Sequence, residues 1–283
     1  MTRRLSVVTA ALLNRFQLQR PLRGGSLLIT IFGDAIVPRG GAISVASLIG
    51  LAAPFGLNER LVRTAMTRLA DDGWLVSRRL GRLSEYRLSG EGRARFAPAT
   101  QQIYSAPLPP WSGRWTLVLL PPAARAQRQA ARQALTWAGF GEAIPGVFAH
   151  PSPLIETMAA LKRRTPALTH ALAFATHSGA EAPHRELAAM GWNLGDLSQR
   201  YQRFVATFSP LERALTAAPT PLQAFLIRTL LIHEYRKIHL RDPLLPAALL
   251  PSRWVGTDAY RLCRDLYARV APASERHLSL IHI

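Results

Sequence analysis

The segment "NERLVRTAMTRLADDGWLVSRRLGRLSEYRLS" (residues 58–89) joins a helical pattern to a hairpin pattern. Asn58 is a favourable N-cap, because its side-chain oxygen can accept hydrogen bonds from the free N–H groups of a first helical turn. Gly73 is expected to end this helix, since glycine readily adopts the left-handed conformation found there. Apolar residues recur every three or four positions between them and predict one buried face. These residues are Leu61, Val62, Ala65, Met66 and Leu69.

A two-stranded hairpin is predicted after Gly73. Trp74, Val76, Tyr86 and Leu88 alternate with polar or basic residues, as in half-buried strands, and "LGRL" (80–83) supplies the turn. Two apolar segments before residue 58 predict two further helices, and the loop that follows them contains a glycine, as in many helix-turn-helix motifs. Three helices followed by a hairpin predict a winged helix-turn-helix. The two earlier helices are expected in "SLLITIFGDAI" (26–36) and "VASLIGLAAPFG" (45–56).

The outward face of the predicted third helix carries guanidinium and hydroxyl groups. A helix of this kind fits the major groove of DNA, where polar side chains reach base edges and arginines neutralise phosphates. Taken singly, each of these residues could equally be a solvated surface residue, but their clustering in one helix and one hairpin favours DNA binding. The residues predicted to contact DNA are Asn58, Arg60, Arg63, Thr64, Thr67, Arg68, Arg78, Arg79, Arg82 and Arg87.

The composition supports an anionic partner and an intracellular location. The chain has 35 basic and 17 acidic residues, a net charge of +18, and residues 1–96 carry half of that excess. The lone Cys263 cannot form an intramolecular disulfide and is expected to be a core thiol in a reducing cytoplasm. The N-terminus resembles a signal peptide but has no evident cleavage site. No apolar run reaches the ~18 residues of a transmembrane helix, so no membrane partner is expected.

Proline-rich stretches divide the sequence into blocks. The stretch "YSAPLPPW" (104–111) cannot continue a helix or a central strand and marks a linker, which we place at residues 98–110. The predicted DNA-binding domain then occupies residues 1–97. Strand and helix patterns alternate through residues 111–185, which predicts a small α/β sandwich. Residues 186–283 have an almost wholly helical pattern.

Three long segments of the sequence resemble one known family: "SLLITIFGDAIVPRGGAISVASLIGLAAPFGLNERLVRTAMTRLADDGWL" (26–75), "PPWSGRWTLVLL" (109–120) and "AFLIRTLLIHEYRKIHLRDPLLPAALLPSRWVG" (224–256). They are similar to the PaaX-type regulators of phenylacetic acid catabolism. The resemblance implies an α+β fold with an N-terminal winged helix-turn-helix, a central ferredoxin-like domain and a C-terminal helical domain. It further implies a homodimeric repressor that binds palindromic operators in double-stranded DNA and is released by the effector phenylacetyl-CoA or a related acyl-CoA.

A candidate effector site lies in "FLIRTLLIHEYRKIHLRDP" (225–243). A CoA thioester needs cationic side chains for its phosphates and an apolar cleft for its acyl group. On a helix, spacings of seven, eight and eleven keep the first four candidates near one face. The alternative is that Arg236 and Arg241 pair with Glu234, Asp242 or acids in other segments and only hold the helical domain together. The candidate effector residues are Arg228, Tyr235, Arg236, His239 and Arg241.

The sequence contains little that indicates an enzyme or a metal site. His233 and Glu234 begin like the zinc motif H-E-x-x-H, but Lys237 stands where the second histidine would be. Cys263 has no context that would activate its thiol, and no G-x-S-x-G motif occurs. We therefore expect no catalytic residue, no metal and no cofactor. Two further alternatives are an acyl-CoA-using enzyme and an RNA-binding or RNA-processing protein, although RNA readers usually expose stacking aromatic rings.

Overall fold

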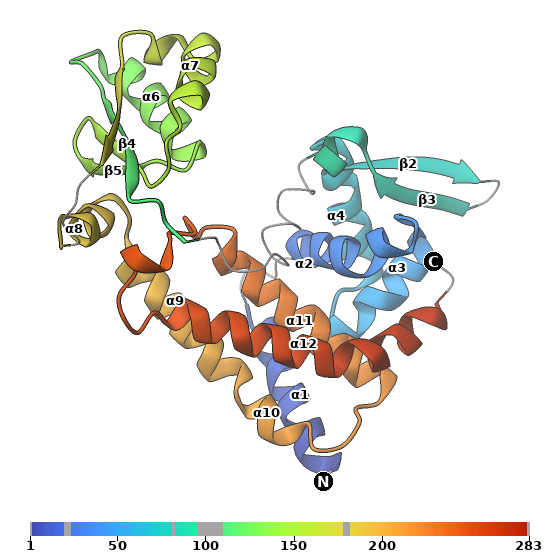
Figure 1. The fold of residues 1–283 in the computed structure, drawn as a ribbon. Helices are drawn as coiled ribbons and strands as arrows, with labels where there is room; N and C mark the ends of the chain where they lie inside the picture. The colour runs from blue at the N-terminus through green and yellow to red at the C-terminus, as the bar shows by residue number, and fades with distance from the viewer. Residues whose placement is uncertain (1, 20–23, 81–82, 95–109, 178–181, 282–283) are drawn as a thin grey trace. The chain divides into compact units, whose positions relative to one another are not determined.

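The computed structural model describes residues 2–19, 24–80, 83–94, 110–177 and 182–281, and combines helices with two antiparallel sheets (Figure 1). The chain divides into two compact units. The first unit contains Met1–Ser105, Arg200–Arg241 and Val255–Ile283, and the second contains Ala106–Gln199 and Asp242–Trp254. The N-terminal block and most of the C-terminal helical block therefore share one unit, although proline punctuation separates them in the sequence. The predicted linker at 98–110 lies almost wholly outside the described residues.

The N-terminal part of the first unit contains the predicted three helices and hairpin, preceded by a further helix. The first predicted helix continues past Ile31 as a π-helical turn and a 3-10 turn. A short strand, β1, adds to the hairpin and gives an antiparallel sheet in the order β1-β3-β2. The elements are α1 (Thr2–Gln17), α2 (Gly24–Ile31), η1 (Phe32–Ile36), η2 (Val37–Arg39), β1 (Ala42–Ser44), α3 (Val45–Ala52), η3 (Ala53–Phe55), α4 (Glu59–Asp71), β2 (Leu75–Leu80) and β3 (Leu83–Leu88).

Two expected core residues of this region face solvent instead. Val76 is 46% exposed, whereas Leu75 and its cross-strand partner Leu88 are buried. The predicted alternation was therefore wrong by one residue in β2, and a shift of one residue exchanges the two faces of a strand. Leu61 is 43% exposed because Val62 and Met66 occupy the buried stripe of α4, about 100° away from it on the helix.

Helices α3 and α4 meet at a sharp angle. The segments Val45–Phe55 and Glu59–Asp71 meet at an angle of 119° across a short connection. Gly56 in that connection has a φ of +81°, a left-handed conformation that glycine adopts without a steric penalty. Among the described residues no single helix is long and apolar enough to cross a membrane, while this bent pair satisfies the same criteria of length and composition when its two arms are counted together.

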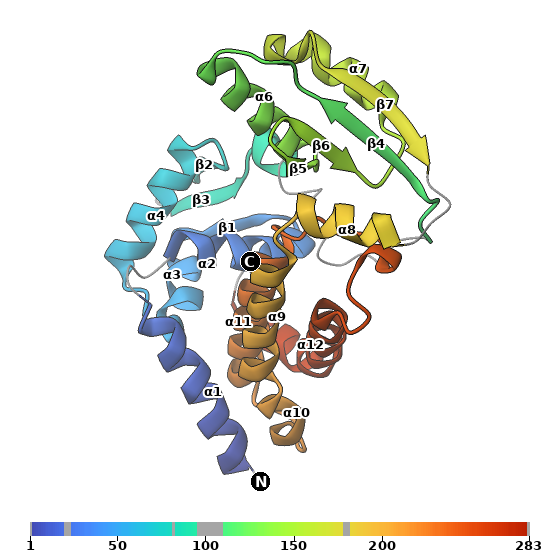
Figure 2. The same ribbon diagram turned by 90° about the vertical axis from the view of Figure 1, so that its left-hand side faces the viewer.

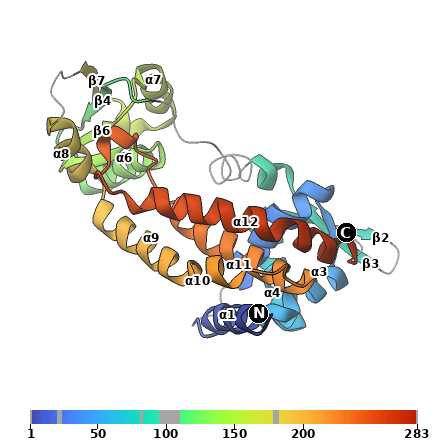
Figure 3. The same cartoon turned by 60° about the horizontal axis from the view of Figure 1, so that its bottom comes forward.

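The C-terminal helices complete the first unit. Helix α11 begins with a capping box between Thr220 and Gln223, and is buried on nearly all sides, as expected for the central helix of a core. Helix α12 packs along it (Figure 3). Cys263 of α12 is buried, and burial raises the pKa of its thiol, so the predicted core thiol is confirmed. The helices are α9 (Leu194–Phe208), which belongs to the first unit from residue 200 onward, α10 (Pro210–Ala214), α11 (Pro221–His239) and α12 (Val255–Ser279).

The second unit is built around a four-stranded antiparallel sheet in the order β5-β6-β4-β7. The order β-α-β-β-α-β along the chain makes it ferredoxin-like, as predicted. Helices α6 and α7 cover one face through a core that includes Leu135 and Phe148, and α8 packs near Trp115 on the other face. The short strand β5 was not predicted. The elements are β4 (Arg114–Leu119), α6 (Arg125–Trp137), β5 (Gly141–Ile144), β6 (Val147–His150), α7 (Ile155–Arg164), β7 (Leu172–His177) and α8 (Ala182–Gly191).

Candidate nucleic-acid interface and ligand cavity

Helix α4 is fixed at both ends by local hydrogen bonds. At the N-terminus, the backbone N–H of Leu61 donates to Oδ1 of Asn58 over 2.9 Å, so the predicted cap is confirmed. At the C-terminus, Gly73 has a φ of +74° and donates to the carbonyl of Ala70. Trp74 donates to the carbonyl of Leu69, which completes a Schellman motif. The face of α4 that does not pack on the core is therefore held in one orientation.

That outward face is basic and hydroxyl-bearing, as predicted. Arg63 pairs with Glu59 one turn earlier at 2.8 Å, and both side chains are about 60% exposed (59% and 61%). Thr67 donates to the carbonyl of Arg63. An exposed pair of this kind contributes little to stability, so a phosphate can displace the carboxylate at small cost. The exposed candidates on or next to α4 are Asn58, Arg60, Arg63, Thr64, Thr67 and Arg68.

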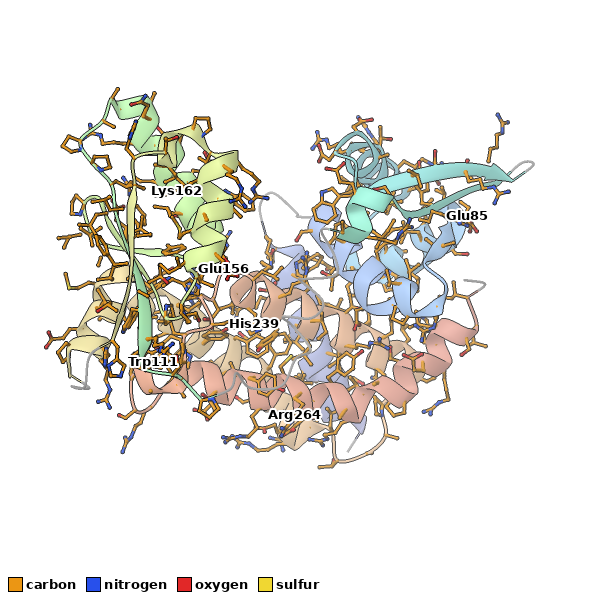
Figure 4. All side chains as sticks on the ribbon, turned by 45° about the horizontal axis from the view of Figure 1, so that its top comes forward. Glu85, Trp111, Glu156, Lys162, His239 and Arg264 are labelled. Atoms are coloured by element: carbon orange, nitrogen blue, oxygen red, sulfur yellow. The ribbon has the colours of Figure 1, made fainter. Side chains whose placement is uncertain are left out.

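The hairpin distributes its arginines over two faces. Arg78 lies directly opposite Glu85, which is labelled in Figure 4, and Arg87, two residues further along β3, shares that face by the strand register. Arg87 pairs with Glu85 at 2.8 Å. Arg79 lies opposite Ser84 on the other face. The structure thus places two of the predicted hairpin arginines together around an acidic residue that the sequence analysis did not single out. Arg82 lies outside the described residues.

Arg228, a predicted effector residue, is instead enclosed in a buried ion-pair network. Its side chain is 3% exposed, and its Nε lies 2.7 Å from Oδ2 of Asp34 in η1. A second nitrogen donates to the backbone carbonyl of Asp34, and a third contacts Glu275 of α12 at 2.5 Å. Tyr267 donates to the other oxygen of Asp34, and burial, followed by this carboxylate, raises its pKa. Arg228 therefore ties α11 to η1 and α12.

Tyr235 and His239 form a buried aromatic pair within α11. Their rings stack with centroids 4.9 Å apart, and Nδ1 of His239 lies 3.3 Å from the hydroxyls of both Tyr235 and Tyr201. Phe204 of α9 packs against Tyr235 at 5.5 Å between ring centroids. These contacts join α9 to α11. They place both predicted effector residues in the core between the two helices.

Arg236 and Arg241, the remaining predicted effector residues, line a cavity of about 660 Å³ in the first unit. Helices α1, α9 and α11 run lengthwise beside one another in Figure 2, and all three contribute to its wall, with Ser26 of α2. The basic lining residues are Arg15, Arg200, Arg203, Arg236, Lys237 and Arg241. The acidic and neutral polar lining residues are Glu234, Gln19, Ser26 and Thr207, and the apolar ones are Leu12, Phe16, Phe204, Phe208, Leu230, Ile238 and Leu240.

Arg236 joins helices to one another, as the alternative raised by the sequence proposed, and the acceptors of three of its hydrogen bonds are on α2. Glu234 pairs with Lys237 at 3.0 Å. Arg236 donates to α2: from Nε to the hydroxyl of Thr30 at 2.8 Å, and from Nη2 to the backbone carbonyl and hydroxyl of Ser26 at 2.6 and 2.9 Å. Arg236 therefore lines the cavity and also binds α2, the helix that packs against α4.

The cavity residues on α1 and α9 were missed because they are far from α11 in the sequence. Their spacing in the sequence gives only a weak indication that they share one face of a helix. Leu12, Arg15, Phe16 and Gln19 fall three or four residues apart, and α9 repeats the same mixture of basic and aromatic residues from Arg200 to Phe208. Only the packing of the helices brings these stripes together. In the part of the chain that the structure describes, no group of three or more His, Cys, Asp or Glu residues is arranged to hold a metal ion.

Known protein families match the chain over almost its whole length. Three family models match in order: PaaX-like protein over residues 23–92, PaaX protein central Cas2-like domain over 108–188, and PaaX-like protein C-terminal domain over 192–280. The transcriptional repressor PaaX of Escherichia coli (strain K12) is 37% identical over 260 residues, which cover 90% of this chain and 82% of that protein. The structure of the uncharacterized protein Rv0674 from Mycobacterium tuberculosis has a similar fold, with a TM-score of 0.54 and 24% identity over 82% of this chain and 90% of that chain.

Proposed function

This chain belongs to the PaaX family, and from that premise we propose that it is a repressor that binds operator DNA through a winged helix-turn-helix and is released by an aryl-acetyl-CoA thioester such as phenylacetyl-CoA. The family predicted from the sequence is confirmed by the matches. The prediction that the chain is a regulator and not an enzyme is confirmed by its repressor relative. We further propose that it acts in the cytoplasm as a homodimer on a palindromic operator.

The observation that carries the DNA-binding proposal is the arrangement of α3 and α4. Helices of a helix-turn-helix meet at about 90–120° across a turn of three or four residues. The angle of 119° between Val45–Phe55 and Glu59–Asp71, with a left-handed Gly56 in the connection, agrees with that motif. In this assignment α4 is the recognition helix, the β2–β3 hairpin is the wing, and β1 joins the wing to the start of α3.

The chemistry of the α4 surface favours duplex DNA over RNA. Arg60 and Thr64 are exposed in the N-terminal half of the helix, which is the half that reaches base edges in such motifs, and Thr67 is exposed just beyond it. Arg78 and Arg87 on the hairpin suit phosphate contacts, which depend on charge more than on geometry. The aromatic residues of this region, Trp74 and Tyr86, are partly buried, so this part of the surface offers no row of stacking rings.

The cavity in the first unit supports the thioester part of the proposal. Its basic residues suit phosphates and its aromatic residues suit an aryl-acetyl group. An effector releases a repressor only if it binds the released state more tightly than the DNA-bound state. A ligand in contact with both α11 and α2 is placed to distinguish two such states.

DNase footprinting on the promoters beside its own gene tests the proposal. The full chain is expected to protect a palindromic duplex site, and phenylacetyl-CoA is expected to remove that protection, while CoA alone has a weaker effect. Gel shifts with an RNA of the same sequence at the same salt concentration provide the comparison. Protection of no duplex site, or tighter binding to the RNA, contradicts the proposal.

A further inference from the structure

We propose that the cavity between α1, α9 and α11 is the effector site and that Arg236 transmits its occupancy to the DNA-binding helices through α2. The ligand class is an organic phosphate with an apolar end. This inference deepens the proposed function and rests on it. It adds the location of the site, the residues that hold the ligand, and the contact through which binding alters α4.

The charge of the cavity lining favours an anionic ligand. Six basic residues and one acidic residue line it, and the acidic residue, Glu234, already pairs with Lys237. Among the described residues, neither Arg15 nor Arg241 has an acidic partner. Guanidinium groups facing a common space repel one another unless an anion lies between them. Arginine binds phosphate through paired, charge-assisted hydrogen bonds, so a phosphate-bearing ligand fits this lining better than a single carboxylate does.

The opposite requirement, for an apolar group, is met by aromatic side chains in the same lining. Phe204 and Phe208 of α9 lie with ring centroids 4.8 Å apart, and Phe16 of α1 belongs to the same cavity. These rings are largely buried, and an aryl or acyl group packed against the parts of them that line the cavity would leave water, which is the main source of affinity in pockets of this kind. The volume of about 660 Å³ lies within the range of ~300–1,000 Å³ typical of small-molecule sites.

Arg236 links this cavity to α2. Its guanidinium lines the cavity while donating three hydrogen bonds to Ser26 and Thr30. These three bonds use Nε and Nη2, and the two N–H groups on Nη1 take part in none of them. A ligand phosphate that draws the guanidinium toward the cavity is expected to lengthen the bonds to Ser26 and Thr30, because the group is rigid and planar. Occupancy of the cavity and the hold on the start of α2 are therefore coupled through one side chain.

The start of α2 lies directly against the recognition helix. A Cβ added at Gly25, next to Ser26, would lie 4.0 Å from the Cβ of Ala65 in α4. The other end of the same segment is held by Arg228, whose contacts with Asp34 lie eight residues after Ser26 and eight residues before Arg236 in the sequence. Loss of the Arg236 bonds would thus free the start of α2 while η1 stays anchored, and α4 would lose the support on which its orientation depends.

Calorimetry and operator-binding titrations on the full chain separate the two parts of this inference. The ligand used is phenylacetyl-CoA, and the control variant is Arg264→Ala, on the exposed face of α12 (Figure 4). Arg203→Ala and Arg15→Ala are expected to raise the Kd for phenylacetyl-CoA at least tenfold, with complete release of operator once the ligand saturates. Arg264→Ala is expected to bind the ligand like the wild type.

The Arg236 variants test the transmission. In Arg236→Ala, saturating phenylacetyl-CoA is expected to change the operator Kd less than threefold, against at least tenfold in the wild type. Arg236→Lys keeps the charge but cannot span three acceptors, so it is expected to bind the ligand and still show the reduced response. This second variant keeps the test decisive if the alanine variant fails to fold.

Each contrary outcome has its own meaning. If the wild type neither binds phenylacetyl-CoA nor loses operator on its addition, the proposed function fails. If the wild type responds and Arg15→Ala and Arg203→Ala titrate like Arg264→Ala, the cavity is not the effector site. If those two variants instead lose operator affinity without any ligand, the cavity binds DNA phosphate and the inference is overturned. A wild-type response in both Arg236 variants overturns the transmission.

Discussion

The arginines of α4 and those of α11 carry the same guanidinium group into different surroundings. Arg60 and Arg68 project from α4 into solvent, while Arg228 is 3% exposed between Asp34 and Glu275. Arg236 is intermediate, because it faces a cavity and also bonds to α2. A guanidinium with a buried carboxylate partner is committed to holding helices together, whereas one in water remains available for a phosphate. Whether an arginine stabilises the fold or can bind a phosphate therefore depends on its partner and its burial, and not on its residue type.

The largest expected effect is a loss of stability on replacing Arg228, the buried arginine of this comparison. Arg228→Ala leaves Asp34 buried without its main partner, and removing one member of a buried ion pair typically costs about 3–5 kcal/mol of unfolding free energy. Urea denaturation followed by circular dichroism measures it. Arg264→Ala, an exposed arginine of α12 paired with Asp265, is the control and is expected to change stability by less than about 0.5 kcal/mol. Equal effects of the two substitutions would contradict the structural role of Arg228.

The exposed side of the comparison is tested by Arg60→Ala. The substitution removes a group predicted to reach a base edge, so operator binding is expected to weaken by about 1–3 kcal/mol while the unfolding free energy stays unchanged. Fluorescence anisotropy with a footprinted duplex measures the affinity. Arg128→Ala, exposed on α6 of the second unit, serves as a control of equal charge change. A loss as large in the control as in Arg60→Ala would mean that net charge alone is responsible.

A smaller effect is expected where α4 begins. Asn58→Ala removes the acceptor for the N–H of Leu61 and is expected to cost about 1 kcal/mol of unfolding free energy. Asn58→Ser retains an acceptor at the cap and is expected to stay close to the wild type. Thermal unfolding of both variants gives the comparison. Identical midpoints for alanine and serine would show that the cap does not stabilise α4.

The smallest effect concerns the hairpin. Arg78→Ala is expected to lower operator and non-specific affinity alike and to reduce the slope of log affinity against log salt by about one, because one phosphate contact is lost. Titrations at four salt concentrations measure the slope. An unchanged slope would remove Arg78 from the phosphate contacts.

The sequence predicted the regions whose structure is specified locally. The cap at Asn58, the stop at Gly73 and the buried stripe through Val62 and Met66 depend on residues within a few turns of one another. The buried face of β2 was predicted one residue out of register. Trp74, Leu75 and Val76 are all apolar, so the alternation of the sequence does not show which of them is buried. β5 was missed because four residues of mixed polarity carry no alternation.

The cavity and the ion-pair network could not be predicted in the same way. Arg228 and Asp34 are separated by 194 residues, and nothing around either one in the sequence indicates the other. The spacing that placed Arg228, Tyr235, Arg236 and His239 near one face of a helix was sound for an isolated helix. It did not indicate that neighbouring helices would bury part of that face, so two of the five candidates line the cavity and three lie in the core.

The most direct test of the account is the specificity of the double variant Arg60→Ala/Thr64→Ala. Its affinity for the footprinted operator and for a scrambled duplex of equal length should be measured by anisotropy at one salt concentration, beside the wild type. If α4 reads bases, the ratio of the two affinities falls at least tenfold, mainly through weaker binding to the operator. If the ratio is the same in both proteins, α4 does not read the operator, and the assignment of this surface is wrong.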